Sequence, residues 1–263
     1  MLKTNVVDVI AYELFHAEKE KQSVKRFVDR FPELDEALAY KVQERLIEIK
    51  CKEENAKIVG RKLGLTSKAK QEMMGVHEPS YGVLLNNMQL NDGEPISIAP
   101  LIHAKVEPEI AFIFNKEVKG PFVSVTEILN ATEYIAPALE IIDSRFHGFR
   151  FTLPDVVADN SSSSRFIIGE NFYKPNSLDL RLMGMVFRKN GEILTTTAGA
   201  AVMGHPARAI AWLANRLSKL GQSIKPGEVV LSGALSGAIT IEPGDQFTAS
   251  FDGIGSVSAV FTE

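Results

Sequence analysis

Apolar side chains recur at helical spacing in the N-terminal part of the chain. In VVDVIAYELFHAEKEK (residues 6–21) and DEALAYKVQERLIEIKCKEE (residues 35–54) they return about once per turn, for example at Leu38, Val42 and Leu46. This spacing is typical of amphipathic helices. The segment FVDRFPEL between them contains a proline and reads as a connector. We therefore expect residues 5–54 to be helical, with one interruption.

From about residue 57 the pattern changes to short apolar runs rich in β-forming residues. Turn signals such as Asn190-Gly191 separate these runs, and one further amphipathic helix is expected between Pro206 and Gly221. This order of elements indicates the α+β class. It predicts a helical N-terminal region over residues 1–75 and a β-rich catalytic domain over residues 76–263.

The composition excludes several classes of protein. The 263 residues include 24% charged and 45% hydrophobic residues, as in ordinary globular proteins. A net charge of −4 without a basic block argues against nucleic-acid binding. No apolar run approaches the roughly 20 residues that a membrane span requires, and the N-terminus does not resemble a signal peptide. The single cysteine, Cys51, excludes an internal disulfide and fits a reducing compartment, so we expect a cytoplasmic protein.

Three glutamates stand in apolar segments that read as strands. Glu107 and Glu109 share one face of KVEPEIAFIF, and Glu140 is the only charge in YIAPALEII. A buried carboxylate is costly unless it is paired or bound to a cation. Oxygen ligands without histidine or cysteine favour Mg²⁺ or Mn²⁺. The Glu107–Glu109 pair taken alone also fits a solvated strand edge, because Pro108 suits edge positions.

Two further segments carry candidate chemistry. Lys62 lies between Gly60 and Gly64 on one strand face of KIVGRKLGLT, which leaves room for a ligand near its ammonium. It is either a solvated lysine or a group that binds an anionic substrate or moves a proton. The segment VVADNSSSSRF, which includes Asp159 and Arg165, is either a polar surface loop or a substrate loop with hydroxyl and guanidinium donors.

GRKLGLTS, KVEPEIAF, ALEIIDSRF, VADNSSSSRF and the closing GIGSVSAVF, in this order, resemble the fumarylacetoacetate hydrolase superfamily, and more closely its branch of hydratases and decarboxylases. The resemblance covers nearly the whole chain. It implies a β-rich roll of mixed sheets with a helical N-terminal region. It also implies a metal triad at Glu107, Glu109 and Glu140, with Lys62 and Ser162 as catalytic residues.

The resemblance implies a metal-dependent carboxy-lyase of aromatic degradation, which converts 2-oxo-3-hexenedioate into 2-hydroxypenta-2,4-dienoate and CO2. Hydratases of the branch tend to carry an aspartate where EPSYG has Ser80, and the stretches around Arg145 and Arg165 look more like the decarboxylases. An arginine could bind the second carboxylate bidentately, so we expect Arg145, Arg165 and Asp159 to bind substrate. The alternative is a hydro-lyase that hydrates 2-hydroxypenta-2,4-dienoate.

The expected partner is a small 2-oxo dicarboxylate. We also expect a homo-oligomer and allow for a complex with the hydratase of the same pathway. A catalytically silent subunit is a third hypothesis, which the intact glutamate triad and Lys62 count against.

Overall fold

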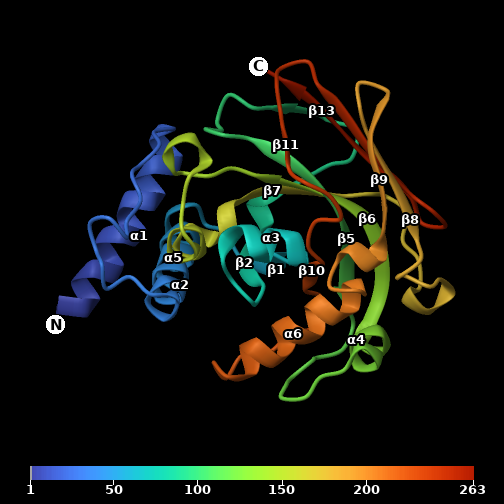
Figure 1. The fold of residues 1–263 in the computed structure, drawn as a ribbon, viewed down its shortest axis with the longest axis horizontal. Helices are drawn as coiled ribbons and strands as arrows, with labels where there is room; N and C mark the ends of the chain where they lie inside the picture. Colours follow the sequence, from blue (N-terminus) through green and yellow to red (C-terminus); the bar gives the residue numbers. More distant parts are fainter. Residues whose placement is uncertain (1) are drawn as a thin grey trace.

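Two β-sheets and a group of N-terminal helices make up the protein (Figure 1). The computed structural model describes residues 2–263. The helices are α1 (Leu2–Glu20), α2 (Glu36–Glu53), α3 (Lys68–Met74), α4 (Val125–Ala131), α5 (Leu153–Ala158) and α6 (Pro206–Ser218). The strands are β1 (Ile58–Gly64), β2 (Ser80–Leu85), β3 (Gln89–Leu90), β4 (Pro95–Ser97), β5 (Lys105–Phe114), β6 (Thr132–Ile142), β7 (Ser163–Ile168), β8 (Gly184–Lys189), β9 (Glu192–Ala198), β10 (Val229–Leu231), β11 (Ile239–Thr240), β12 (Gln246–Phe251) and β13 (Gly255–Thr262).

The larger sheet contains eight strands in the order β2-β1-β10-β5-β6-β7-β3, with β11 also paired to β5. Most neighbours are antiparallel, but β1 runs parallel to β10 and β3 runs parallel to β7. The smaller sheet has the order β4-β13-β12-β8-β9. In the smaller sheet β4 runs parallel to β13 and the other neighbours are antiparallel. Both sheets are therefore mixed, and the predicted fold class is confirmed.

The long strands β5 and β6 form the centre of the larger sheet. One of its faces carries residues such as Val106, Ile110 and Ile141, which belong to a core shared with the smaller sheet and with α4 and α6. The other face carries Ala111 and Ala138, which pack with residues from α2, β2 and β10. Because side chains alternate along a strand, the same two strands line two separate cores.

Helices α1, α2 and α5 gather at one end of the molecule, on the left in Figure 1. They bury a core of their own that includes Ile10, Leu14 and Leu46. Asp35 begins α2 by accepting a hydrogen bond of 2.8 Å from the Leu38 amide, the usual role of an N-cap aspartate. The predicted helices of residues 5–54 and the helix after Pro206 are confirmed.

The structure adds elements that the apolar pattern did not predict. Helix α5 begins just before the expected polar segment and overlaps its first residues, with Thr152 and Asp155 making a capping box at its start. Strand β1, which the predicted boundary places in the N-terminal region, pairs with β2 and β10 of the larger sheet. The division at residue 75 stays a prediction. None of the helices among residues 2–263 has the length and apolar composition needed to cross a membrane.

Candidate active site

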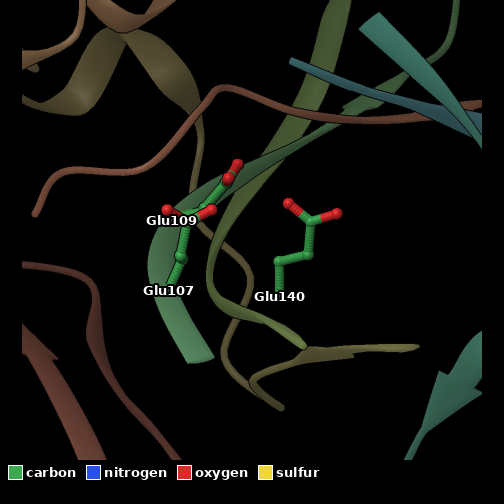
Figure 2. A group of neighbouring side chains, drawn as sticks. All are labelled: Glu107, Glu109 and Glu140. Atoms are coloured by element: carbon green, nitrogen blue, oxygen red, sulfur yellow. The ribbon is translucent and has the colours of Figure 1, made fainter. Parts of the chain in front are cut away.

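The three glutamates singled out in the sequence meet on one face of the larger sheet (Figure 2). Glu107 on β5 lies directly opposite Glu140 on β6, and Glu109 follows two residues later on the same face. One carboxylate oxygen from each residue lies within 4.8 Å of the other two. The antiparallel register therefore brings the acid of β6 to the two acids of β5 and forms one carboxylate cluster.

The carboxylate cluster is buried and only partly hydrogen-bonded. Glu109 and Glu140 are 0% exposed and Glu107 is 6% exposed. Glu109 accepts a hydrogen bond of 2.7 Å from the Gly233 amide through one oxygen. Within residues 2–263, its other oxygen and Oε1 of Glu140 accept none. Burial, together with repulsion from Glu140, raises the pKa of Glu109 well above its usual range.

Two lysine ammoniums face the cluster. Lys62 Nζ lies 3.0 Å from Glu140 Oε2 and donates a hydrogen bond of 3.1 Å to the carbonyl of Ser161. Lys70 Nζ lies 2.6 Å from Glu107 Oε1. Although burial opposes the change, Lys70 and Lys62 lower the pKa of Glu107. Two ammoniums offset three carboxylates only in part, and the remaining negative charge suits a cation.

Lys70 is a site residue that the sequence did not reveal. It lies on α3, a seven-residue helix capped by Ser67 at its start and by Gly75 at its end. A signal was present, because serine is a common N-cap residue and glycine commonly follows the last residue of a helix. That pattern does not say which part of the sheet the helix covers.

The polar loop after α5 lies beside Lys62. Asn160, Ser161 and Ser162 have φ values of 50°, 52° and 56°, a left-handed conformation that is costly for residues other than glycine. Hydrogen bonds hold it in place: the Asn160 side chain donates to and accepts from the Val83 backbone, and Ser161 Oγ donates to the carbonyl of Tyr81. Such strain is typical of functional loops.

Ser162 keeps a free hydroxyl in this strained loop. The residue is 2% exposed, and its Oγ has no hydrogen-bond partner in the described part of the chain. An unpartnered buried hydroxyl is uncommon in proteins and calls for a ligand or water.

Glycine is required at Gly82 on β2, because a Cβ atom there would lie 2.6 Å from the Asn160 carbonyl oxygen. The sequence therefore allows the loop to approach β2 closely.

Arg145 and Asp159 are buried together at the edge of the site. The Arg145 Nε atom donates to Asp159 Oδ1, and its terminal nitrogens donate to the carbonyls of Asp159 and Ser163. Arg145 also lies 3.9 Å from Glu18, which receives two hydrogen bonds from Lys50. We call Glu18, Lys50, Arg145 and Asp159 the N-terminal ion cluster. Its hydrogen bonds tie Arg145 to the polar loop and do not support the expected substrate contact.

Arg165 is not brought to the carboxylate cluster either. It pairs with Ile141, whereas Glu140 pairs with Phe166, so the Arg165 side chain leaves the opposite face of the sheet. It lines a separate cavity of about 410 Å³ next to Glu18. The expected substrate contact of Arg165 is therefore not supported by its place in the fold.

The residues present fit a hard divalent cation. Three carboxylate groups converge from two adjacent strands, oxygens among them lack partners within the described residues, and the local charge is negative. Oxygen donors of this kind suit Mg²⁺ or Mn²⁺ and leave coordination positions for water or substrate.

The mixed-sheet fold and its buried carboxylate cluster define the class of protein. The family described as fumarylacetoacetate (FAA) hydrolase, C-terminal, matches residues 49–262. The chain belongs to this family, as the sequence resemblance indicated, and is an enzyme of the FAA hydrolase superfamily.

The similar proteins include both decarboxylases and hydratases. The chain is 40% identical to a 4-oxalocrotonate decarboxylase from Pseudomonas sp. strain CF600, over 99% of this chain and 98% of that one. It is 38% identical to a 2-hydroxyhexa-2,4-dienoate hydratase from Comamonas testosteroni, over 95% of each chain. A solved structure of 4-oxalocrotonate decarboxylase from Pseudomonas putida G7, complexed with magnesium and adipate, superposes with a TM-score of 0.93 at 40% identity over 97% of both chains.

Proposed function

We propose that this enzyme decarboxylates 2-oxo-3-hexenedioate (4-oxalocrotonate) to 2-hydroxypenta-2,4-dienoate and CO2 with the help of a divalent metal ion. The observation that carries the proposal is the buried carboxylate cluster with unpartnered oxygens, faced by two lysines. The similarity to 4-oxalocrotonate decarboxylases, one of them solved with magnesium and adipate, supports the choice of reaction.

Glu107, Glu109 and Glu140 would hold the metal ion, which we propose to be Mg²⁺, with Mn²⁺ as a possible substitute. When bound, the ion would supply Lewis-acid stabilisation of negative charge on the 2-oxo group. The Gly233 amide fixes one Glu109 oxygen, so the carboxylate is already oriented before a cation binds. Such orientation of a ligand by its neighbours strengthens metal binding.

The substrate is a vinylogous β-keto acid, so its distal carboxylate can leave as CO2. The electron pair of the C5–C6 bond forms the C4–C5 double bond, the C3–C4 double bond moves to C2–C3, and the C2 oxygen takes the negative charge and then a proton. We propose that Lys62 binds near this oxygen and supplies the proton, because its ammonium is buried beside Glu140.

Ser162 would orient the substrate through its free hydroxyl. The strained loop of residues 160–162 presents this group at a defined place, since Lys62 contacts the adjoining Ser161 carbonyl. Holding the C1–C4 enone in one plane with the C5–C6 bond roughly perpendicular to it lets the electron pair of that bond overlap with the conjugated system, and fixing this geometry lowers the entropic part of the barrier. Arg145 and Asp159 would act on the same loop from behind as positioning residues.

Hydration of 2-hydroxypenta-2,4-dienoate is the second candidate, because hydratases are also among the similar proteins. One assay separates the candidates. The protein with Mg²⁺ is incubated with 2-oxo-3-hexenedioate and, separately, with 2-hydroxypenta-2,4-dienoate. We expect CO2 from the first substrate. Formation of 4-hydroxy-2-oxopentanoate from the second, without CO2 from the first, would identify a hydratase, and no reaction with either would indicate a silent subunit.

The expected homo-oligomer, the complex with a pathway hydratase and the cytoplasmic location stay predictions.

A further inference from the structure

A 2-oxo dicarboxylate needs two recognition sites, one for its 2-oxo acid end and one for its distal carboxylate. The inference here rests on the proposed function, because it concerns the second site. The two arginines expected for that role lie elsewhere: Arg145 is bound within the N-terminal ion cluster, and Arg165 leaves the opposite face of the sheet. The distal carboxylate therefore requires another cation.

We propose that Lys70 on α3 binds the distal carboxylate and makes the site selective for dicarboxylates. Its Nζ atom lies 2.6 Å from Glu107 Oε1, so it already contacts a carboxylate at the edge of the cluster. The Lys70 side chain is 27% exposed, whereas those of Glu107 and Lys62 are 9% and 3% exposed. Lys70 thus stands at the solvent side of the cluster, where the far end of a bound substrate would lie.

The charges of the site support this role. The three carboxylates, one divalent cation and the Lys62 ammonium are together neutral. A bound 2-oxo dicarboxylate adds two negative charges, and Lys70 supplies an additional positive charge that offsets one of them. Among residues 2–263, the one hydrogen-bond acceptor of the Lys70 ammonium is Glu107 Oε1. A cation held by Glu107 competes for this carboxylate, which frees the ammonium for an anionic ligand.

The turn before α3 fixes Lys70 relative to the cluster. Ser67 caps the Lys70 amide at 3.2 Å, and the Gln71 side chain donates a hydrogen bond of 2.8 Å to the Leu65 carbonyl. Thr66 packs against Gly233 so closely that a Cβ atom there would lie 2.3 Å from its hydroxyl oxygen. The Gly233 amide also binds Glu109. The turn of residues 65–67 therefore connects α3, which carries Lys70, to the carboxylate cluster.

Other lysines near the cluster fit the role less well. Lys62 is 2% exposed and is engaged by Glu140 and the Ser161 carbonyl. Lys105 lies on the same strand face as Glu107, but its ammonium sits 4.0 Å from the centre of the Phe149 ring. Lys68, two residues before Lys70, has an 89% exposed side chain, and its Nζ atom lies 3.9 Å from Glu72 Oε1 on the same helix.

The test compares two ligands that differ only at the distal end, 2-oxoadipate and 2-oxohexanoate. Their affinities for the Mg²⁺-loaded enzyme are measured by calorimetry. We expect the wild type to prefer 2-oxoadipate. Lys70→Met should weaken 2-oxoadipate binding by about tenfold or more, the usual effect of losing a charge-assisted hydrogen bond. Binding of 2-oxohexanoate to the Mg²⁺-saturated variant should change by less than about twofold, or ~0.4 kcal/mol. Mg²⁺ alone should bind at least as tightly as to the wild type, because Lys70 no longer competes for Glu107.

Lys68→Met is the matched control and should behave as the wild type, while Lys70→Arg should retain most of the preference. The proposal is overturned if Lys70→Met weakens both ligands equally, or if the wild type binds both ligands alike. CO2 release from 2-oxo-3-hexenedioate by the wild type is measured separately. If no CO2 is released but the preference for 2-oxoadipate over 2-oxohexanoate depends on Lys70, only the proposed reaction is rejected. If CO2 is released but Lys70→Met keeps the wild-type preference, only the role of Lys70 is rejected.

Discussion

Two clusters of buried charges lie on either side of the polar loop, and they differ in how completely their charges are satisfied. In the N-terminal ion cluster, Arg145 is hydrogen-bonded to Asp159 and Lys50 to Glu18. In the carboxylate cluster, oxygens of Glu109 and Glu140 have no partner among the residues described. Burial of charge is common to both clusters. The carboxylate cluster, whose oxygens lack hydrogen-bond partners, is suited to binding a ligand, whereas the N-terminal ion cluster, whose charges are paired, supports the fold.

Glu107→Gln should have the largest effect on activity and little effect on the fold. It removes one of three proposed metal ligands, and Lewis-acid stabilisation of several kcal/mol corresponds to a loss of about a thousandfold or more in turnover. Thermal unfolding should be unchanged or shifted slightly downward, because the variant loses the ion pair of Glu107 with the partly exposed Lys70. Turnover is measured by CO2 release and Mg²⁺ affinity by calorimetry. An active variant with unaltered Mg²⁺ binding would remove Glu107 from the site.

Lys62→Ala should lower turnover far more than metal affinity. Loss of a proton donor costs about 10²–10⁴-fold in rate, whereas the three carboxylates remain. Lys57→Ala, at an exposed position just before β1, is the control and should retain wild-type turnover. Equal turnover of the two variants would show that Lys62 takes no part in the reaction.

Arg145→Met should act on stability, in contrast to changes in the carboxylate cluster. It leaves Asp159 buried without its ion partner, which costs about 3–5 kcal/mol and is measured by urea unfolding. Arg26→Met is the control: Arg26 pairs with Asp29 on the surface, and its loss should cost less than about 1 kcal/mol. If Arg145→Met unfolded at the same urea concentration as the control, the supporting role of the N-terminal ion cluster would be wrong.

Glu18 should give the N-terminal ion cluster a dependence on acidic pH. Although burial opposes the change, Lys50 and Arg145 lower the pKa of Glu18 to about 2. A carboxyl group with a lower pKa in the folded state stabilises the fold above its usual pKa near 4.5, and this contribution is lost as the pH falls toward 2. The size of this contribution is about 3 kcal/mol.

The Glu18 prediction is checked by urea unfolding from pH 6 down to the lowest pH at which the protein stays folded. Glu18→Gln should be less stable at pH 6 and should show a flatter decline below about pH 4.5. Parallel curves for the variant and the wild type would contradict the assignment.

The sequence predicted the parts of the fold that depend on local patterns. Helices α1, α2 and α6 follow from apolar residues at helical spacing, and β5 and β6 follow from short apolar runs rich in β-forming residues. The Asn190-Gly191 turn joins β8 and β9 with both residues at positive φ, as a two-residue hairpin turn requires. The three glutamates were found for the same reason: charges inside apolar strands are visible without knowledge of the tertiary fold.

The roles of Arg145, Arg165 and Lys70 depend on contacts between distant segments. On β7 the Arg165 side chain lies on the sheet face opposite to that of Ser164 and Phe166. The pairing of Arg165 with Ile141 decides which of the two faces this is. Arg145, in the loop after β6, meets Glu18, which lies 127 positions earlier in the chain, on α1. No local pattern records such pairings.

The sequence by itself determined which residue types could form a metal site, because an acid in an apolar strand is unstable unless a cation or a partner satisfies it. It also determined the family, through motifs spread along the chain. The tertiary structure decided which charges are satisfied by the protein and which are left for a ligand. Strand register brought Glu107 opposite Glu140, and the turn before α3 brought Lys70 to them. Both arrangements depend on contacts between segments that are distant in the sequence, so they form only when the whole chain is packed.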